Sequence, residues 1–303
     1  MRARILTVVA AVFAMLAFAA PAQAIKNGEP DAGAHPYVGQ LLFFDPTATD
    51  PRFSDPGGWF NCTGTLVSPT IVVTAGHCTF PEGTNGEPTP GNTGGNDVWI
   101  SFAEVPDYSI LPPSSTFAPD NNEGRYDAWS TALNASTEWI RATAYPHPEY
   151  DDAAFFTHDL GVLRLSEPVI LPEYGQLPTL GLLDELYAAN KQQLYTAVGY
   201  GLEGAGPKKS FGGDTRRKAD LRLVNLTGVG GIGNGISAKF SNNANTGGTC
   251  FGDSGGPIFL AGTNIITSVN SYAKNSTCSG TTGAYRIDQP DDLAFLATFG
   301  ITP

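Results

Sequence analysis

Short apolar segments, separated by turns rich in glycine and proline, recur along almost the whole chain. The 303 residues include 36 Gly and 23 Pro, and only 15% are charged, a composition that favours strands and turns over long charged helices. Short segments with apolar alternation predict β-strands. We expect strands at residues 35–44, 60–67, 70–74, 98–102, 138–144, 159–165, 196–200, 219–226, 258–260 and 265–270. Many short strands with turn signals between them favour an antiparallel barrel or sandwich.

The end of the chain has the pattern of a short helix. Asp288 is the expected N-cap, Pro290 lies in the first turn, and Gly300 would stop the helix. Two long segments, 79–96 and 106–128, are rich in loop-forming residues and are expected to be loops. The sequence therefore predicts an all-β protein with one short C-terminal helix.

The start of the chain has the features of a targeting segment. Arg2 and Arg4 precede an apolar run at residues 5–20, and an Ala-x-Ala sequence ends at Ala24. The run is short for a membrane span, which needs about 20 residues. We expect a signal peptide at 1–24, a secreted protein and no stable membrane association.

Cleavage of the signal peptide could occur at either of two positions. Cleavage after Ala24 would make Ile25 the first residue of a mature protein spanning 25–303. Cleavage near Ala20 would leave a short propeptide in front of Ile25.

The formal net charge of the chain is −12, so a nucleic-acid partner is not expected.

Four cysteines are present: Cys62, Cys78, Cys250 and Cys278. An even number in an exported chain predicts two disulfides, and four cysteines allow three connectivities. The chain has no Cys-x-x-Cys pair, so we expect no structural zinc site.

Ser254 lies in a turn that contains Gly252, Gly255 and Gly256. Glycine lets the backbone turn tightly and approach a substrate closely. A serine on such a turn suits nucleophilic attack, with neighbouring backbone N–H groups to stabilise an oxyanion. This turn alone does not establish catalysis, because a base and a group that orients the base are also needed.

The best candidate for the base is His77, one of four histidines in the chain. It follows an apolar segment and precedes Cys78. Asp159 begins another apolar segment, where a carboxylate is costly unless it is paired or used. Together with Ser254 these residues provide the components of a Ser-His-Asp triad.

Three blocks resemble the signature sequences of the chymotrypsin/trypsin family of serine endopeptidases, in particular secreted members of the bacterial type. They are Thr-Ala-Gly-His-Cys at 74–78, His-Asp-Leu-Gly-Val-Leu at 158–163 and Gly-Asp-Ser-Gly-Gly-Pro at 252–257. Residues 25–28 resemble the mature amino terminus of the family, and residues 283–287 resemble its late pocket strand. The resemblance implies two antiparallel six-stranded β-barrels, roughly 25–170 and 171–303, with the site between them.

The resemblance also implies the chemistry. Ser254 would be the nucleophile, His77 the general base and then acid, and Asp159 the group that orients the imidazole. The N–H groups of Gly252 and Ser254 would form the oxyanion hole. The implied activity is hydrolysis of peptide bonds in proteins or peptides through an acyl-enzyme, by a monomer without a metal or organic cofactor.

The family pattern implies two disulfides, Cys62–Cys78 and Cys250–Cys278. It further implies that a new amino terminus at Ile25 folds inward, so that its ammonium pairs with Asp253.

The implied specificity pocket consists of Gly248, Thr249, Asn270, Ser271 and Gly283. Gly248, expected at the base of the pocket, carries no charge, so an apolar residue is expected before the cleaved bond (the P1 position). The chain departs from the family at 269–272, where Val-Asn-Ser-Tyr stands near the usual Ser-Trp-Gly. The interval between the histidine and the aspartate is also longer than usual, because of inserted loops.

Three other interpretations fit parts of the sequence. The Gly-x-Ser-x-Gly turn also fits an α/β-hydrolase, but that fold needs a histidine after Ser254, and none follows. A catalytically inactive, binding-only homologue would have the same fold but would usually lack a member of the triad. His147, Asp151, Asp152 and His158 could suggest a metal cluster, but a polar turn is the favoured interpretation.

Overall fold

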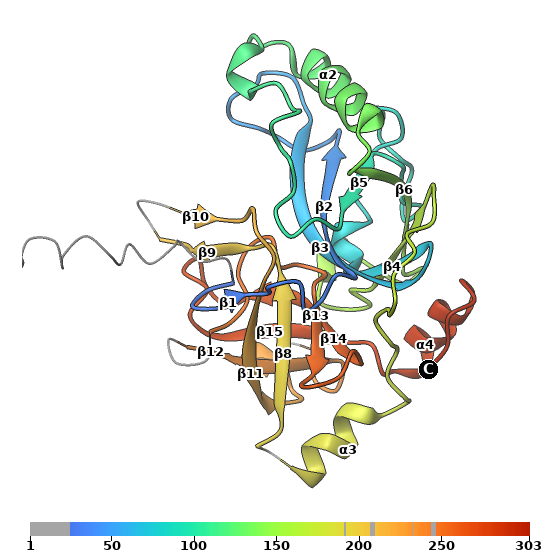
Figure 1. Cartoon of the computed structure of the whole chain (residues 1–303), viewed down its shortest axis with the longest axis vertical. Coiled ribbons are helices and arrows are strands. Elements are labelled where there is room, and N and C mark those ends of the chain that lie inside the picture. Colours follow the sequence, from blue (N-terminus) through green and yellow to red (C-terminus); the bar gives the residue numbers. More distant parts are fainter. Residues whose placement is uncertain (1–24, 191, 207–209, 232, 244–246) are drawn as a thin grey trace, which may run out of the picture.

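The computed structural model describes five ranges of the chain, 25–190, 192–206, 210–231, 233–243 and 247–303 (Figure 1). The signal peptide expected at 1–24 lies outside the described residues.

The first half forms a closed antiparallel barrel with the strand order β2-β3-β4-β7-β6-β5. Its strands are β2 (Val38–Asp45), β3 (Gly58–Ser68), β4 (Ile71–Thr74), β5 (Val98–Ser101), β6 (Ile140–Pro146) and β7 (Gly161–Leu165). Leu41, Leu66 and Ile100 are fully buried in its core. In β7 the apolar residues are buried and Arg164 is exposed, as expected for a strand with one face toward a core.

The second half forms another ring of six strands. They are β8 (Leu194–Gly199), β11 (Arg217–Asn225), β12 (Ser237–Asn242), β13 (Pro257–Leu260), β14 (Ile266–Ala273) and β15 (Gly280–Arg286). The ring closes where β11 pairs with β8. The short strand β1 (Glu29–Pro30) adds to β11, and β9 (Leu202–Gly204) pairs with β10 (Phe211–Gly212). The expected pair of six-stranded antiparallel barrels is therefore confirmed.

The structure has more helix than the sequence predicted. The helices are α2 (Asn122–Ala135), α3 (Leu182–Ala189) and α4 (Pro290–Ala297), with single 3₁₀ turns η2 (Gly76–Cys78), η3 (Ser114–Thr116), η4 (Asp152–Ala154) and η5 (Val229–Gly231). No helix in the described ranges has the length and apolar character that crossing a membrane requires.

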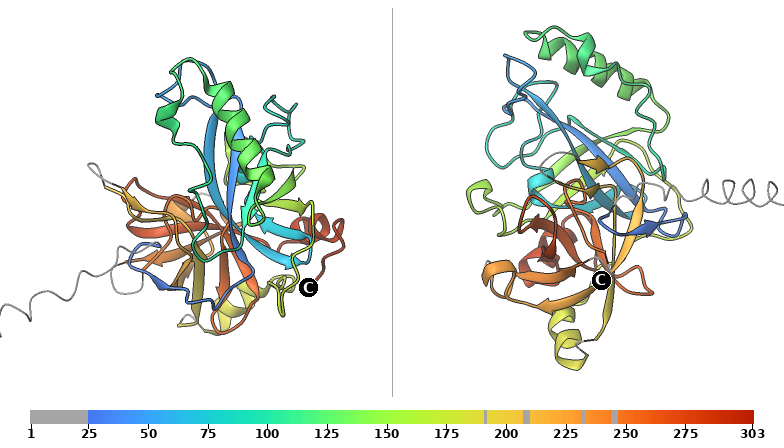
Figure 2. Two further views of the ribbon diagram at one scale, coloured as in Figure 1. Left: turned by 45° about the horizontal axis from the view of Figure 1, so that its top comes forward. Right: turned by 90° about the vertical axis from the view of Figure 1, so that its left-hand side faces the viewer.

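Helix α2 corrects the expectation of a loop at 106–128, because its first turns lie within that segment. The Asn121 side chain caps the helix by accepting the N–H of Gly124 at 3.1 Å. Trp129 packs against Trp59, with ring centres 5.1 Å apart, so that α2 covers the outer end of the first barrel (Figure 2). The stabilising contacts come from the barrel wall, whereas the local sequence is rich in loop-forming residues.

The expected C-terminal helix is present as α4, but its N-cap is Gln289 instead of Asp288. The carboxylate of Asp288 instead binds the guanidinium of Arg286, at 2.9 Å from Nε, and accepts the N–H of Leu183 at 2.8 Å. Asp288 therefore accepts a hydrogen bond from the first turn of α3 instead of capping α4.

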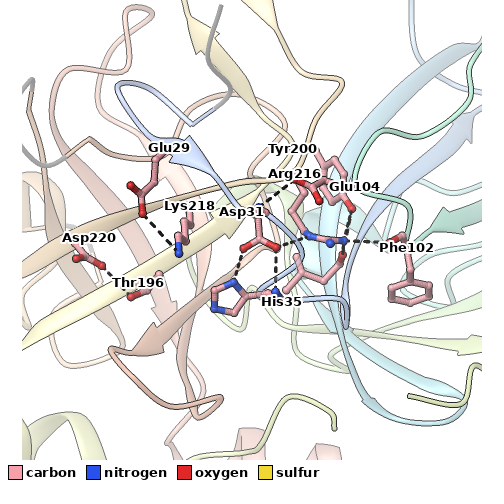
Figure 3. Close-up of polar contacts among 12 residues, drawn as sticks. Glu29, Asp31, His35, Phe102, Glu104, Thr196, Tyr200, Arg216, Lys218 and Asp220 are labelled. Atoms are coloured by element: carbon pink, nitrogen blue, oxygen red, sulfur yellow. Dashed lines mark hydrogen bonds and ion pairs between the residues drawn. The ribbon is translucent and has the colours of Figure 1, made fainter. Parts of the chain in front are cut away.

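The two barrels are joined by a buried arginine of the second half (Figure 3). Arg216 donates from Nη1 to the carbonyl oxygens of Val38 and Phe102, both on the first barrel, at 3.1 and 3.0 Å. Its Nε donates to the buried carboxylate of Asp31 at 2.9 Å, and the Tyr200 hydroxyl lies 3.0 Å from Nη1. This cluster fixes the N-terminal segment and both barrels relative to one another.

Candidate active site

Three candidate residues for catalysis meet where the two barrels face each other. His77 lies in η2, directly after β4, and Asp159 lies two residues before β7. Because β4 pairs with β7, with Thr74 opposite Gly161, these two segments are adjacent. Ser254 comes from the second barrel, in the turn that leads into β13.

The carboxylate of Asp159 is fully buried and satisfied by His77 and Ser271. Nδ1 of His77 lies 3.0 Å from each carboxylate oxygen, and the backbone N–H of His77 donates to Oδ1 at 2.9 Å. The hydroxyl of Ser271 donates to Oδ2 at 2.5 Å. These contacts hold the imidazole ring in one orientation and direct Nε2 away from the carboxylate.

The electrostatics of His77 combine two opposing effects. Burial of the ring favours its neutral form, but the charge and the hydrogen bond of Asp159 favour the imidazolium. The net result raises the pKa of His77 above its usual value of about 6.5. A proton taken up by this ring is therefore stabilised by Asp159.

The turn that carries Ser254 is packed tightly against the first barrel. The Ser254 carbonyl accepts the N–H of Thr63 at 2.8 Å. Gly255 has φ = +74°, and a Cβ atom there would lie 2.0 Å from Oγ1 of Thr74, so only glycine fits. The N–H groups of Gly252 and Ser254 donate to no group within the described ranges.

Two disulfides anchor the segments around the site. Cys62–Cys78 ties the residue after His77 to β3, and Cys250–Cys278 ties the Ser254 turn to the segment before β15. This is the pairing that the family resemblance implies.

The two residues of the expected activation pair are both buried. The side chain of Ile25 belongs to the core of the second barrel, and Gly248 pairs with Lys26 next to it. The Asp253 carboxylate accepts the N–H groups of Gly201 and Cys250, each at 2.8 Å. Within the described ranges it has no cationic partner, and burial raises its pKa to about 7.

Two cavities meet at His77 and Ser254, with Asp152 also lining both. The larger, about 530 Å³, is formed mainly by first-barrel segments that include Phe43 and Phe60. The smaller, about 360 Å³, is lined mainly by segments around β14 and β15 of the second barrel. The candidate nucleophile therefore lies between two adjoining cavities.

The smaller cavity includes three of the five residues expected in the specificity pocket, namely Thr249, Asn270 and Ser271. Gly248 and Gly283 are not among the residues that line this cavity. A Cβ atom on Gly248 would lie 2.1 Å from the side chain of Asn242, and one on Gly283 would lie 2.2 Å from the ring of Tyr272. These two glycines provide space for neighbouring side chains of the protein.

Sequence reasoning missed Thr282 and Tyr272, which also line this cavity. The register shifts between Asn270 and Tyr272 because of a bulge, so their positions could not be counted along the strand. The Thr249 hydroxyl lies 2.5 Å from Oδ1 of Asn270 and 2.6 Å from the Thr282 hydroxyl. Buried polar groups of the pocket thus satisfy one another.

The fold is similar to that of several solved structures. A structure of HL collagenase aligns with 92% of this chain and 100% of its own, with a TM-score of 0.60 and 16% identity. The structure of GrC covers 90% of this chain and 96% of its own, with a TM-score of 0.57 and 15% identity. A scabies mite inactivated protease paralogue, S-D1, covers 92% of this chain and 100% of its own, also with a TM-score of 0.57 and 15% identity. No curated protein matches the sequence.

The family model described as Trypsin matches residues 124–289, more than half of the chain. The chain therefore belongs to the trypsin family and contains a trypsin-like serine protease domain. The matched range includes Asp159 and Ser254, whereas His77 lies before it.

We predict that Asp159→Asn lowers the pKa of His77. In the unchanged protein the imidazolium is stabilised by the carboxylate, so the protonated ring should persist above pH 6.5. Titration of the histidine rings by ¹⁵N NMR, in the unchanged protein and in the variant, measures this difference. An unchanged His77 titration in the variant would contradict the assigned coupling.

Proposed function

We propose that this protein is a secreted serine endopeptidase that hydrolyses peptide bonds through an acyl-enzyme. The observation that carries the proposal is the meeting of the His77–Asp159 pair and the Ser254 turn beside two adjoining cavities. A peptide bound across both cavities would have its scissile bond next to Ser254. Proteins or peptides are the corresponding substrates.

The proposed chemistry needs only groups of the chain, the substrate and water. Oγ of Ser254 bonds to the carbonyl carbon while its proton moves to Nε2 of His77. The substrate carbonyl becomes an oxyanion, which the N–H groups of Gly252 and Ser254 stabilise. The imidazolium protonates the leaving amine as the C–N bond breaks. Water then attacks the ester, and His77 again takes and returns the proton.

Ser254→Ala should fold normally and lose nearly all turnover, because it removes the atom that forms the acyl bond. By analogy with other Ser-His-Asp sites, we expect kcat to fall by about 10⁴-fold or more, with residual catalysis from binding and oxyanion stabilisation. Peptide hydrolysis and labelling by a fluorophosphonate probe measure the effect. Ser130→Ala, at a partly exposed position of α2, is the matched control and should keep both properties. An unlabelled wild-type protein would indicate an inactive homologue.

An apolar P1 residue is the specificity that the smaller cavity supports. Its Thr249, Asn270 and Thr282 side chains are uncharged and hydrogen-bonded among themselves. An arginine head group buried there without a carboxylate would cost on the order of several kcal/mol, or more than about a hundredfold in rate. An apolar side chain gains roughly 1.5–3 kcal/mol from burial.

We predict that kcat/KM for peptides with Phe, Tyr, Leu or Met at P1 exceeds that for otherwise identical peptides with Arg, Glu or Ala. Asp152, the acid that lines both cavities, provides the control. If Arg were preferred tenfold and Asp152→Asn abolished this preference, Asp152 would be the specificity determinant. Preference for Arg in both proteins would also overturn the apolar assignment.

We further infer that secretion activates the protein. Cleavage of the signal peptide after Ala24 would free the amine of Ile25, which would then pair with Asp253. The support is a buried carboxylate that accepts two backbone N–H groups, has no cationic partner within the described ranges, and has a pKa raised to about 7 by burial. A cation at this position would stabilise its charged form.

The activation proposal predicts that one extra residue before Ile25 reduces peptide hydrolysis to near background. The ammonium would then lie one residue too far from Asp253. Amino-terminal sequencing of the active, secreted protein should give Ile25 as the first residue. Full activity of the extended protein would refute the pairing and leave the proposed chemistry at Ser254 intact.

A further inference from the structure

A second group of ionisable side chains lies behind the candidate active site. His147 follows β6, and His158 directly precedes Asp159. Asp291 and Asp292 belong to the first turn of α4. One ligand atom from each of these four residues lies within 4.8 Å of the others. Asp151 and Asp152, which the sequence grouped with the histidines, are not part of this cluster.

The ring of His158 has the arrangement of a metal ligand. Its Nε2 lies 3.3 Å from the carboxylate of Glu149, which can hold a proton on that nitrogen. Its Nδ1 lies 3.2 Å from Oδ2 of Asp291, yet Nδ1 is buried and makes no hydrogen bond within the described ranges. Metal-binding histidines commonly donate their second ring nitrogen to a carboxylate in this way.

The second carboxylate of the cluster, Asp292, is fully buried. The Tyr285 hydroxyl lies 3.1 Å from Oδ1, but Oδ2 is buried and accepts no hydrogen bond from a described residue. A buried carboxylate oxygen without a donor is costly, and a cation would satisfy it.

We propose that His158, Asp291 and Asp292 form a binding site for a divalent transition-metal ion of the Zn²⁺ type, with Nδ1 of His158 and one oxygen of each carboxylate as ligands. His147 stacks on His158, with ring centres 4.9 Å apart and planes 13° apart, and so positions its ring. The Nδ1 atom of His147 accepts the N–H of Glu149 at 3.2 Å, so His147 is assigned this positioning role instead of a ligand role.

The donor set favours zinc over calcium. Imidazole nitrogen with carboxylate oxygen is a common zinc environment, whereas calcium prefers six to eight oxygen ligands. Ligand atoms about 2.0 Å from a tetrahedral ion lie roughly 3.3 Å from one another. The 3.2 Å between His158 and Asp291 matches this edge. Asp292 closes the site from the buried side, and water would fill the fourth position.

A metal ion at this site would connect two parts of the structure. Helix α4 follows the last strand of the second barrel, and its Phe295 packs against His147 of the first barrel, with ring centres 5.0 Å apart. His158 has φ = +50°, which is uncommon for a residue other than glycine, and adjoins Asp159. A metal ion would therefore fasten α4 to the segment that carries the Asp159 carboxylate.

The test is titration of the metal-free, full-length secreted protein with Zn²⁺ by calorimetry, and with Co²⁺ by visible absorption. We expect one ion per chain and the absorption of a four-coordinate Co²⁺ site. His158→Ala and Asp291→Asn should each weaken Zn²⁺ binding at least tenfold. Asp291 is partly exposed, so its variant should still fold even if a change at Asp292 does not.

Two controls separate this site from others. His77→Ala should bind Zn²⁺ as the unchanged protein does, because its imidazole belongs to the active site. Ca²⁺ at the same concentration should not compete. The proposal is overturned if the unchanged protein binds no Zn²⁺, if His158→Ala and Asp291→Asn bind it with unchanged affinity, or if His77→Ala alone abolishes binding.

Discussion

The position of one barrel relative to the other is the constraint on which the rest of the site depends. His77 and Asp159 belong to the first barrel and Ser254 to the second, so a small rotation between barrels would separate them. Arg216 opposes such a rotation, because its guanidinium binds Asp31 and two carbonyl groups of the first barrel. A buried ion pair contributes little net stability relative to apolar packing, but its directed hydrogen bonds define one arrangement. His35 adds to it by donating its backbone N–H to Asp31 at 2.9 Å.

The buried carboxylates around the site differ in how they are satisfied. Asp159 accepts the His77 backbone N–H and the Ser271 hydroxyl, and faces the His77 ring, so both of its oxygen atoms are hydrogen-bonded. Asp31 is buried to a similar degree, and His35 and Arg216 lower its pKa to about 2 despite the opposing effect of burial. Asp253 accepts two backbone N–H groups, and burial raises its pKa. Asp31 and Asp253 differ because Asp31 has the positive charge of Arg216 beside it, whereas Asp253 has no cationic partner among the described residues.

Ser271 shows how one side chain serves two parts of the site. It lines the smaller cavity and also donates its hydroxyl to Asp159. The same strand, β14, contributes Asn270 to the polar base and Tyr272 to the cavity wall, and its bulge lets these consecutive residues face the cavity. Strand β14 thus lines the proposed substrate pocket and also contacts Asp159, which orients the His77 ring, through the hydroxyl of Ser271.

The local sequence patterns by themselves indicated an all-β fold and most strand positions, because apolar alternation and glycine turns act over a few residues. The two six-stranded barrels and the grouping of His77, Asp159 and Ser254 were implied by the resemblance of three short blocks to a known family. Only the tertiary structure decided that α2 forms, because tryptophans of the barrel wall stabilise it. It also decided that Asp288 accepts a hydrogen bond from α3 instead of capping α4. It also decided that Gly248 and Gly283 make room for Asn242 and Tyr272, and that His158 lies beside Asp291. These outcomes depend on strand register and on tertiary contacts, of which those of Asp288 with Leu183 and of His158 with Asp291 join residues more than a hundred positions apart. A single bulge also changes which side chains face the cavity.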